Sequence, residues 1–154
     1  MKLCKMKKIS RRNAVFMIGA FSSSMMLPIN SLASTKMVSD RIKEITKGLG
    51  AEESDLFLDL PEIAENGNQV KVSFEIDSPM TEKEFVKTVY ILADGNPAPN
   101  VAKFNFTPAL GSCSATTRIR LSKTQNVHLL AAYNNGKFAI TKSKVKVTIG
   151  GCGG

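Results

Sequence analysis

The chain has 154 residues, of which 43% are hydrophobic, with three cysteines, one histidine and a formal net charge of +8. Six of its 21 basic residues lie among the first thirteen residues, which contain no acid, so the part after residue 33 has 15 basic and 13 acidic residues, net +2. A basic surplus confined to one end is no argument for nucleic-acid binding. The 121 residues that follow are enough for one domain with its own core.

Residues 1–33 have the three parts of an export signal: a basic start, an apolar stretch over residues 14–29, and small residues at Ser31-Leu32-Ala33. We expect cleavage after Ala33 and no stable membrane anchor, because the apolar stretch is short and contains several serines. Ser10-Arg11-Arg12 favours a twin-arginine signal and hence a periplasmic protein. A Sec signal with a basic start is the alternative, since the residues after the arginine pair depart from the twin-arginine motif. Cys4 would be lost with the signal.

After the signal, apolar residues with helical spacing predict one short helix over residues 36–48, ended by Gly48 and Gly50. The period then changes to two, which indicates strands. Asn134-Asn135-Gly136 is typical of a hairpin turn between two of them. The predicted strands are residues 56–60, 70–76, 85–93, 102–106, 115–121, 126–133, 137–141 and 145–149.

A short helix followed by seven or so antiparallel strands indicates a mainly β protein, an immunoglobulin-like β-sandwich over residues 34–149. The likeness is one of architecture only, because the chain has no tryptophan to pack between two sheets.

The last five residues, 150–154, read Gly-Gly-Cys-Gly-Gly. We expect Gly150, Gly151, Gly153 and Gly154 to form a flexible C-terminal arm that leaves the Cys152 thiol sterically bare. The alternation of the preceding strand runs through Ile149 without a break, so a rigid sheet feeds directly into this arm. Extended, the arm would hold the thiol roughly 10 Å clear of the sheet, enough to enter a narrow channel in another protein.

No second group completes a catalytic or metal site around this thiol. The single histidine, His128, lies on a predicted strand, where a structural role is commoner than a catalytic one, and catalysis would require it beside Cys152. No cluster has metal-ligand spacing. We expect Cys113 to be a small, partly buried residue, although an oxidising compartment could pair it with Cys152 in a disulfide.

The charges are segregated along the sequence. Residues 34–94 contain all 13 acids and have a net charge of −6, whereas residues 95–154 contain eight basic residues and no acid. Solvated strand faces would explain this pattern, and so would a basic surface around the thiol that attracts anions or an acidic partner.

Three parts of the sequence resemble the SoxY family, the sulfur carriers of the periplasmic thiosulfate-oxidising Sox system. The defining part is the terminal segment Val145–Gly154, with Cys152 between its glycines. Thr117–Leu121 followed by Thr124–Val127, and Asn96–Pro99 leading into Ala102–Phe104, also look like that family. The resemblance covers essentially the whole chain after the signal.

The resemblance implies that Cys152 carries pathway intermediates as a covalent adduct and that the chain is a carrier, without enzyme activity or a cofactor of its own. A c-type cytochrome complex like SoxAX would join thiosulfate to the thiol, giving a cysteine S-thiosulfonate. A SoxB-like hydrolase would release sulfate, and a SoxCD-like sulfane dehydrogenase, where the host has one, would oxidise the remaining sulfur. SoxZ would be the heterodimer partner. Because each adduct is an anion, Arg118, Arg120, Lys144 and Lys146 are expected to offset its charge.

Two other classes of protein fit parts of the pattern. Ubiquitin-like sulfur carriers also end in Gly-Gly, but they work in the cytoplasm and need a central helix that this strand pattern lacks. A secreted β-sandwich scaffold would use Cys152 for an intermolecular disulfide. A thiosulfonate or persulfide adduct on the C-terminal peptide is expected for a SoxY-like carrier and for neither of these two alternatives.

Overall fold

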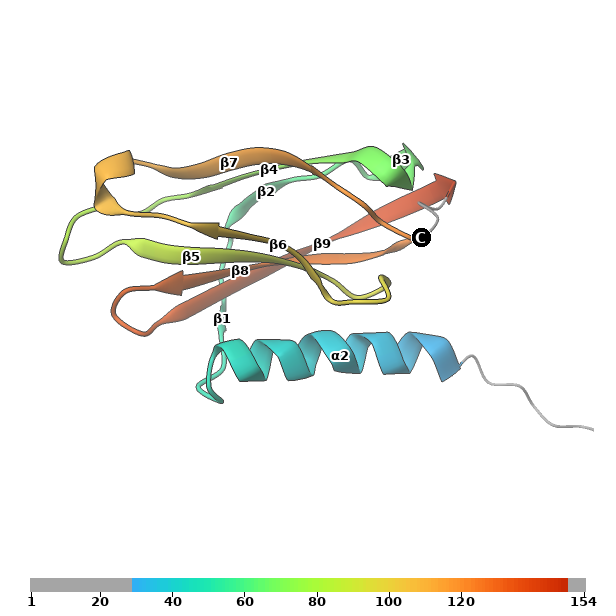
Figure 1. Ribbon diagram of the computed structural model, residues 1–154, viewed down its shortest axis with the longest axis horizontal. Coiled ribbons are helices and arrows are strands. Elements are labelled where there is room, and N and C mark those ends of the chain that lie inside the picture. The colour runs from blue at the N-terminus through green and yellow to red at the C-terminus, as the bar shows by residue number, and fades with distance from the viewer. Residues whose placement is uncertain (1–28, 150–154) are drawn as a thin grey trace, which may run out of the picture.

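The computed structural model describes residues 29–149, which form a β-sandwich with one helix along its outer side (Figure 1). Residues 1–28, which are most of the predicted signal, and residues 150–154, the predicted arm, lie outside the described residues. The fold is mainly β with an N-terminal helix, as the sequence predicts.

Helix α2 spans Ile29–Ile45 and so begins seven residues earlier than predicted. No proline or glycine interrupts residues 29–45, so nothing in the sequence stops a helix there. The predicted cleavage site at Ser31-Leu32-Ala33 lies within this helix. It ends at Ile45, three residues before the predicted end, and the turn that follows is closed by Gly48, whose φ is +81° and whose N–H donates to the carbonyl of Lys43 at 2.9 Å.

Two sheets make up the sandwich. The larger sheet has the strand order β1-β9-β8-β5-β6, with β3 also paired to β9, and the smaller has the order β2-β4-β7. The strands of the larger sheet are β1 (Glu52–Glu53), β3 (Ile63–Asn66), β5 (Val86–Ala93), β6 (Asn100–Asn105), β8 (Gln125–Tyr133) and β9 (Phe138–Ile149). Those of the smaller sheet are β2 (Phe57–Asp59), β4 (Val70–Ile76) and β7 (Cys113–Ile119), and two short 3₁₀ helices, η1 (Gly67–Gln69) and η2 (Pro108–Leu110), precede β4 and β7.

The long strands pair antiparallel, as predicted, whereas the short β1 and β3 pair parallel to β9. These two strands were not predicted, because each is too short to show a period of its own. The predicted segments 137–141 and 145–149 form one continuous strand, β9, which follows the predicted turn; there Gly136 has φ +84°. Strand β9 is therefore the longest in the described part of the chain and extends to the last described residue.

The core lies between the facing sheets, and alternate residues of β4 are buried in it, as period two requires. From β4 these are Val70, Val72, Phe74 and Ile76, and the Phe74 ring packs edge-on against Phe104 at 5.4 Å between centroids. The other face of the larger sheet is turned toward α2 (Figure 1). There Leu92, Leu130 and Val38 are buried outside the main core.

Candidate functional site

Cys152 and its four glycine neighbours lie outside the described residues, so the structure describes the root of the arm, which is the end of β9. Three peptide links join Ile149 to Cys152, and consecutive Cα atoms are 3.8 Å apart, so Cys152 lies within about 11 Å of Ile149 in any conformation. The surroundings of Ile149 are therefore the surroundings that the thiol can reach.

The root is held on one side up to Ile149 and on the other side up to Val147. On one side β3 pairs with β9, Ala64 opposite Val147 and Asn66 opposite Ile149, and the Thr148 hydroxyl donates to the carbonyl of Glu65 at 2.9 Å. On the other side the Val147 N–H donates to the hydroxyl oxygen of Thr124 at 3.0 Å. The expectation that the strand continues through Ile149 is confirmed.

Asn96 fixes the loop that carries Thr124. Its side-chain amide donates to the carbonyl of Arg120 at 2.9 Å, and its side-chain oxygen accepts from the Ser122 N–H at 3.0 Å. Neither Thr124 nor Asn96 was singled out as a structural anchor in the sequence analysis, because each acts through a partner more than twenty residues away. Sequence spacing alone gives no signal for such pairs.

Basic side chains gather at the end of the sandwich where β9 stops. They come from the start of β4, the end of β7 and its following loop, and the last part of β9: Lys71, Arg118, Arg120, Lys123, Lys144 and Lys146. All six are exposed, and none forms an ion pair with a carboxylate of residues 29–149. Glu62 and Glu65 are the acidic residues beside this end of β9. Part of the segregation in sequence thus becomes segregation in space.

Cys113 is the first residue of β7 and only 2% exposed, so it is more deeply buried than expected. Burial raises the pKa of its thiol to about 11, which leaves little reactive thiolate at neutral pH. It pairs with Ile76, at the opposite end of the β4–β7 ladder from Ile119, which is roughly 20 Å away at 3.3 Å per residue. The Leu121 N–H donates to the carbonyl of Gly67, next to Asn66, so it is the Ile119 end of β7 that lies beside the arm root.

A disulfide requires Cα atoms within about 7 Å of each other. With a reach of about 11 Å from Ile149, Cys152 falls short of a thiol on the far end of β7. The geometry therefore argues against the intramolecular pairing of Cys113 with Cys152 that the sequence analysis left open.

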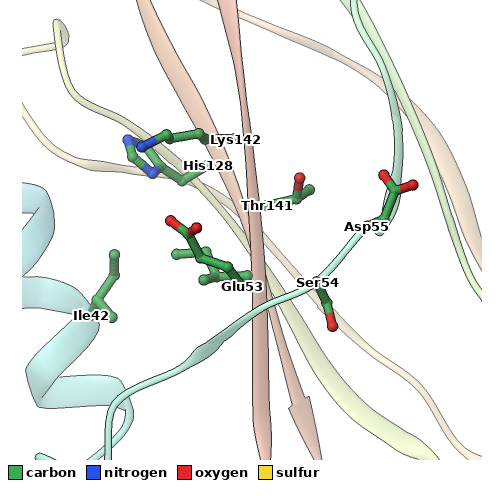
Figure 2. Close-up of a pocket in the computed structure, with 8 residues that line it drawn as sticks. Ile42, Glu53, Ser54, Asp55, His128, Thr141 and Lys142 are labelled. Carbon is green, nitrogen blue, oxygen red and sulfur yellow. The ribbon is translucent and has the colours of Figure 1, made fainter.

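His128 lies on β8 beneath α2, on the face of the larger sheet that is turned away from the core (Figure 2). It is paired with Lys142, seven residues before the end of β9 and about 23 Å along that strand. That separation is about twice the reach of Cys152, so this fold does not bring the two together as a catalytic pair. The expectation of a structural histidine agrees with this placement.

The space between α2 and the sheet is a cavity of about 400 Å³, lined in part by Ile42, Glu53, His128 and Lys142 (Figure 2). The His128 Nε2 atom is buried there without a hydrogen-bond partner, 3.8 Å from an Asp94 carboxylate oxygen. Burial lowers the pKa of His128, and the charge of Asp94 opposes that shift. The Asp94 carboxylate itself accepts hydrogen bonds from the backbone and side-chain amides of Asn126.

Among residues 29–149, no group of three or more His, Cys, Asp or Glu side chains is placed to hold a metal ion. No helix in this part of the chain is long and apolar enough to span a membrane. The described residues at the end of β9 therefore form a rigid, basic surface next to the point where residues 150–154 begin.

Known structures with the same fold include a sulfur carrier protein and superoxide reductases. The chain is similar to the sulfur carrier protein SoxY from Chlorobium limicola f. thiosulfatophilum, with 28% identity, a TM-score of 0.65, and coverage of 77% of this chain and 97% of that one. It is also similar to superoxide reductase (neelaredoxin) from Ignicoccus hospitalis, with 14% identity, a TM-score of 0.55, and coverage of 61% and 80%. The second likeness shows the fold alone.

No curated protein sequence matches the chain significantly. The family model described as "Sulfur oxidation protein SoxY" matches residues 33–152, which is most of the chain and includes the cysteine of the terminal motif. The chain belongs to the SoxY family of sulfur oxidation proteins.

Proposed function

We propose that this protein is a covalent carrier of sulfur intermediates in thiosulfate oxidation and that Cys152 is the attachment site. Membership in the SoxY family supports a sulfur-carrier role in the Sox system. The observation that favours Cys152 as the attachment site is the structure of the end of β9, which is the root of the arm. Strand β9 is held by Thr124 at Val147 and by β3 as far as Ile149, and the glycines begin at the next residue.

In the proposed chemistry the Cys152 thiol is the attachment point, and partner enzymes catalyse the steps. In the loading step, Cys152–SH and thiosulfate form a new S–S bond, giving Cys152–S–S–SO₃⁻, and release one proton and two electrons. The electrons require an acceptor, which the haems of a c-type cytochrome complex like SoxAX would provide. A SoxB-like hydrolase would then add water across the terminal S–S bond, releasing sulfate and leaving a persulfide on Cys152. A SoxCD-like dehydrogenase, where present, would oxidise that persulfide sulfur.

A carrier has a physical advantage over free intermediates. Thiosulfate and its products are small anions that diffuse away between enzymes, whereas an intermediate tethered through a short arm stays at high effective concentration. Glycines on both sides of Cys152 add no side chains to block entry into a narrow active site. One thiol can therefore serve several enzymes in turn.

The compartment and the partner form part of the same proposal. The basic start, apolar stretch and arginine pair within residues 1–33 support export to the periplasm, where the c-type cytochromes would be found. SoxZ would bind as the heterodimer partner, by analogy with the family.

Replacing Cys152 with serine in the host tests the proposal, with Cys113→Ser as the matched control. C152S should abolish thiosulfate-dependent respiration, because serine cannot form the S–S bond. C113S should retain it, since Cys113 is buried and lies beyond the reach of the arm. Unchanged respiration in C152S would refute the carrier role. A reducible dimer joined through Cys152, without any adduct, would instead support a scaffold function.

A further inference from the structure

A hollow of about 370 Å³ lies on the smaller sheet, lined by Lys71 of β4 and by Thr116, Thr117 and Arg118 of β7. Strand β7 is the outer strand of the order β2-β4-β7, so the hollow lies at an open sheet edge. It is separate from the cavity beneath α2, which is lined by residues of other strands.

The two cations of this hollow face each other directly. Lys71 and Arg118 are partners in the antiparallel ladder, a position in which Cβ atoms are about 5 Å apart and like charges destabilise the sheet. The next ladder pair on the same face is neutral: Ser73 pairs with Thr116, whose hydroxyl donates to the Ser73 hydroxyl at 3.0 Å. The ladder thus places two positive charges directly opposite each other.

No carboxylate of the described residues forms an ion pair with either cation. Asp59 of β2 pairs with Ser73, which makes it a diagonal neighbour of Lys71, yet it forms no ion pair with the lysine. A small anion between the two side chains would relieve the repulsion and accept charge-assisted hydrogen bonds. The planar fork of arginine matches the oxygens of a tetrahedral oxyanion well.

The hollow lies near the root of the arm. Lys71 follows Val70, the first residue of β4, and η1 alone separates β4 from Asn66, the partner of Ile149. Figure 1 shows the ends of β9 and β3 on the same side of the molecule as the start of β4 and the end of β7. The end of β9 that leads to Cys152 therefore lies at the same end of the sandwich as this charge pair.

We propose that Lys71 and Arg118 form a binding site for a sulfur oxyanion, with the –SO₃⁻ group of thiosulfate or of its cysteine adduct as the ligand. The identity of the anion rests on the proposed function, whereas the presence of an anion site rests on the charge pair and the hollow. The ligand has two sources, free thiosulfate and the adduct on the protein's own arm, and both present the same sulfonate group.

Free anions are tested by amide NMR on purified protein carrying Cys152→Ser, titrated with sodium thiosulfate and sodium sulfate against sodium chloride of equal ionic strength. We expect saturable shifts at the Thr116 and Thr117 amides. The double variant K71Q/R118Q should bind at least about tenfold more weakly, because it lacks both charged donors. The matched control K87Q/K137Q removes two exposed cations elsewhere and should bind like the parent.

The adduct is tested on protein that retains Cys152, treated with tetrathionate. Attack by the thiolate on a central sulfur of tetrathionate leaves –S–SO₃⁻ on the cysteine and releases thiosulfate. Shifts at Thr116 and Thr117 that vanish in K71Q/R118Q would identify the arm as the source, and saturable shifts with free thiosulfate would identify the free ion.

A thermal melt separates a binding role from a structural one. Without anions K71Q/R118Q should melt slightly higher than the parent, because the repulsion is gone, and thiosulfate should raise the melting temperature of the parent alone. Absence of shifts with both ligand sources would overturn the site. Neither result depends on loading in cells, so the carrier function can stand if this site fails.

Discussion

The two ends of the sandwich differ in their burial: one buries a cysteine, and the other is an exposed strand end that a cysteine follows in the sequence. Where β7 begins, Cys113 is sealed in the core and its thiol pKa is raised to about 11. Where β9 stops, Ile149 is 69% exposed, cations without carboxylate partners surround the strand, and a cysteine follows three residues later. The two ends differ because one seals its thiol in the core, whereas the other is an exposed strand end from which the chain continues to Cys152.

Stiffening the arm should reduce thiosulfate oxidation strongly, even though both cysteines remain. In G150P/G151P the thiol remains, but two prolines fix φ and restrict the paths by which Cys152 can enter a partner enzyme. We expect thiosulfate oxidation to fall by a factor of a hundred or more, while alkylation of Cys152 by a small reagent stays near the parent rate. Normal oxidation in this variant would contradict a role for the glycines.

The burial of Cys113 predicts unequal thiol reactivity. A pKa raised from 9.0 to about 11 lowers the thiolate fraction at pH 8 by about a hundredfold, so Cys113 should react with iodoacetamide about a hundredfold more slowly than an unperturbed thiol. Peptide mapping over time measures this rate beside that of Cys152. Both cysteines should react alike in urea, and rapid labelling of Cys113 in the native protein would contradict its burial.

Removing charge near the root should have a smaller effect that depends on salt. The variant R118Q/R120Q/K144Q/K146Q should slow transfer of cargo to partner enzymes about tenfold at low salt, and much less at 0.5 M salt, where the Debye length is only a few ångströms. Stopped-flow measurements at two ionic strengths would show this. Equal transfer rates at low salt in parent and variant would show that these four residues have no role in cargo transfer.

His128 should make the smallest contribution, to stability alone. Its pKa is lowered in the folded state, so the unfolded chain binds the proton more readily. The resulting stability is present above the ordinary pKa of about 6.5 and is lost as the pH falls below it. Chemical denaturation at pH 7.5 and pH 5.5 should show a larger loss in the parent than in H128Q. An equal loss in both would show that another group is responsible.

Much of the fold could be predicted from the sequence because the long strands carry their own pattern. Val70 to Ile76 alternates buried and exposed residues, and Asn134-Asn135-Gly136 forms the turn that it indicates. Strands β1 and β3 could not be predicted, since two and four residues show no period and both depend on β9 as a parallel partner.

The candidate site divides in the same way. Cys152 and its glycines are evident from local sequence alone, and the continuity of β9 up to Ile149 follows from alternation. The opposition of Lys71 and Arg118 depends on the register between strands that are 47 residues apart in sequence, and Thr124 anchors Val147 across a loop. Such pairings exist only in the folded chain, so spacing could not reveal them.

The central claim is that Cys152 carries the cargo and Cys113 does not. Mass spectrometry of the protein purified from thiosulfate-grown cells, intact and after digestion, tests it directly. The account predicts thiosulfonate or persulfide mass on the C-terminal peptide that contains Cys152, and an unmodified peptide that contains Cys113. A C-terminal peptide found only as free thiol or as a reducible dimer, under conditions of active thiosulfate oxidation, would contradict it.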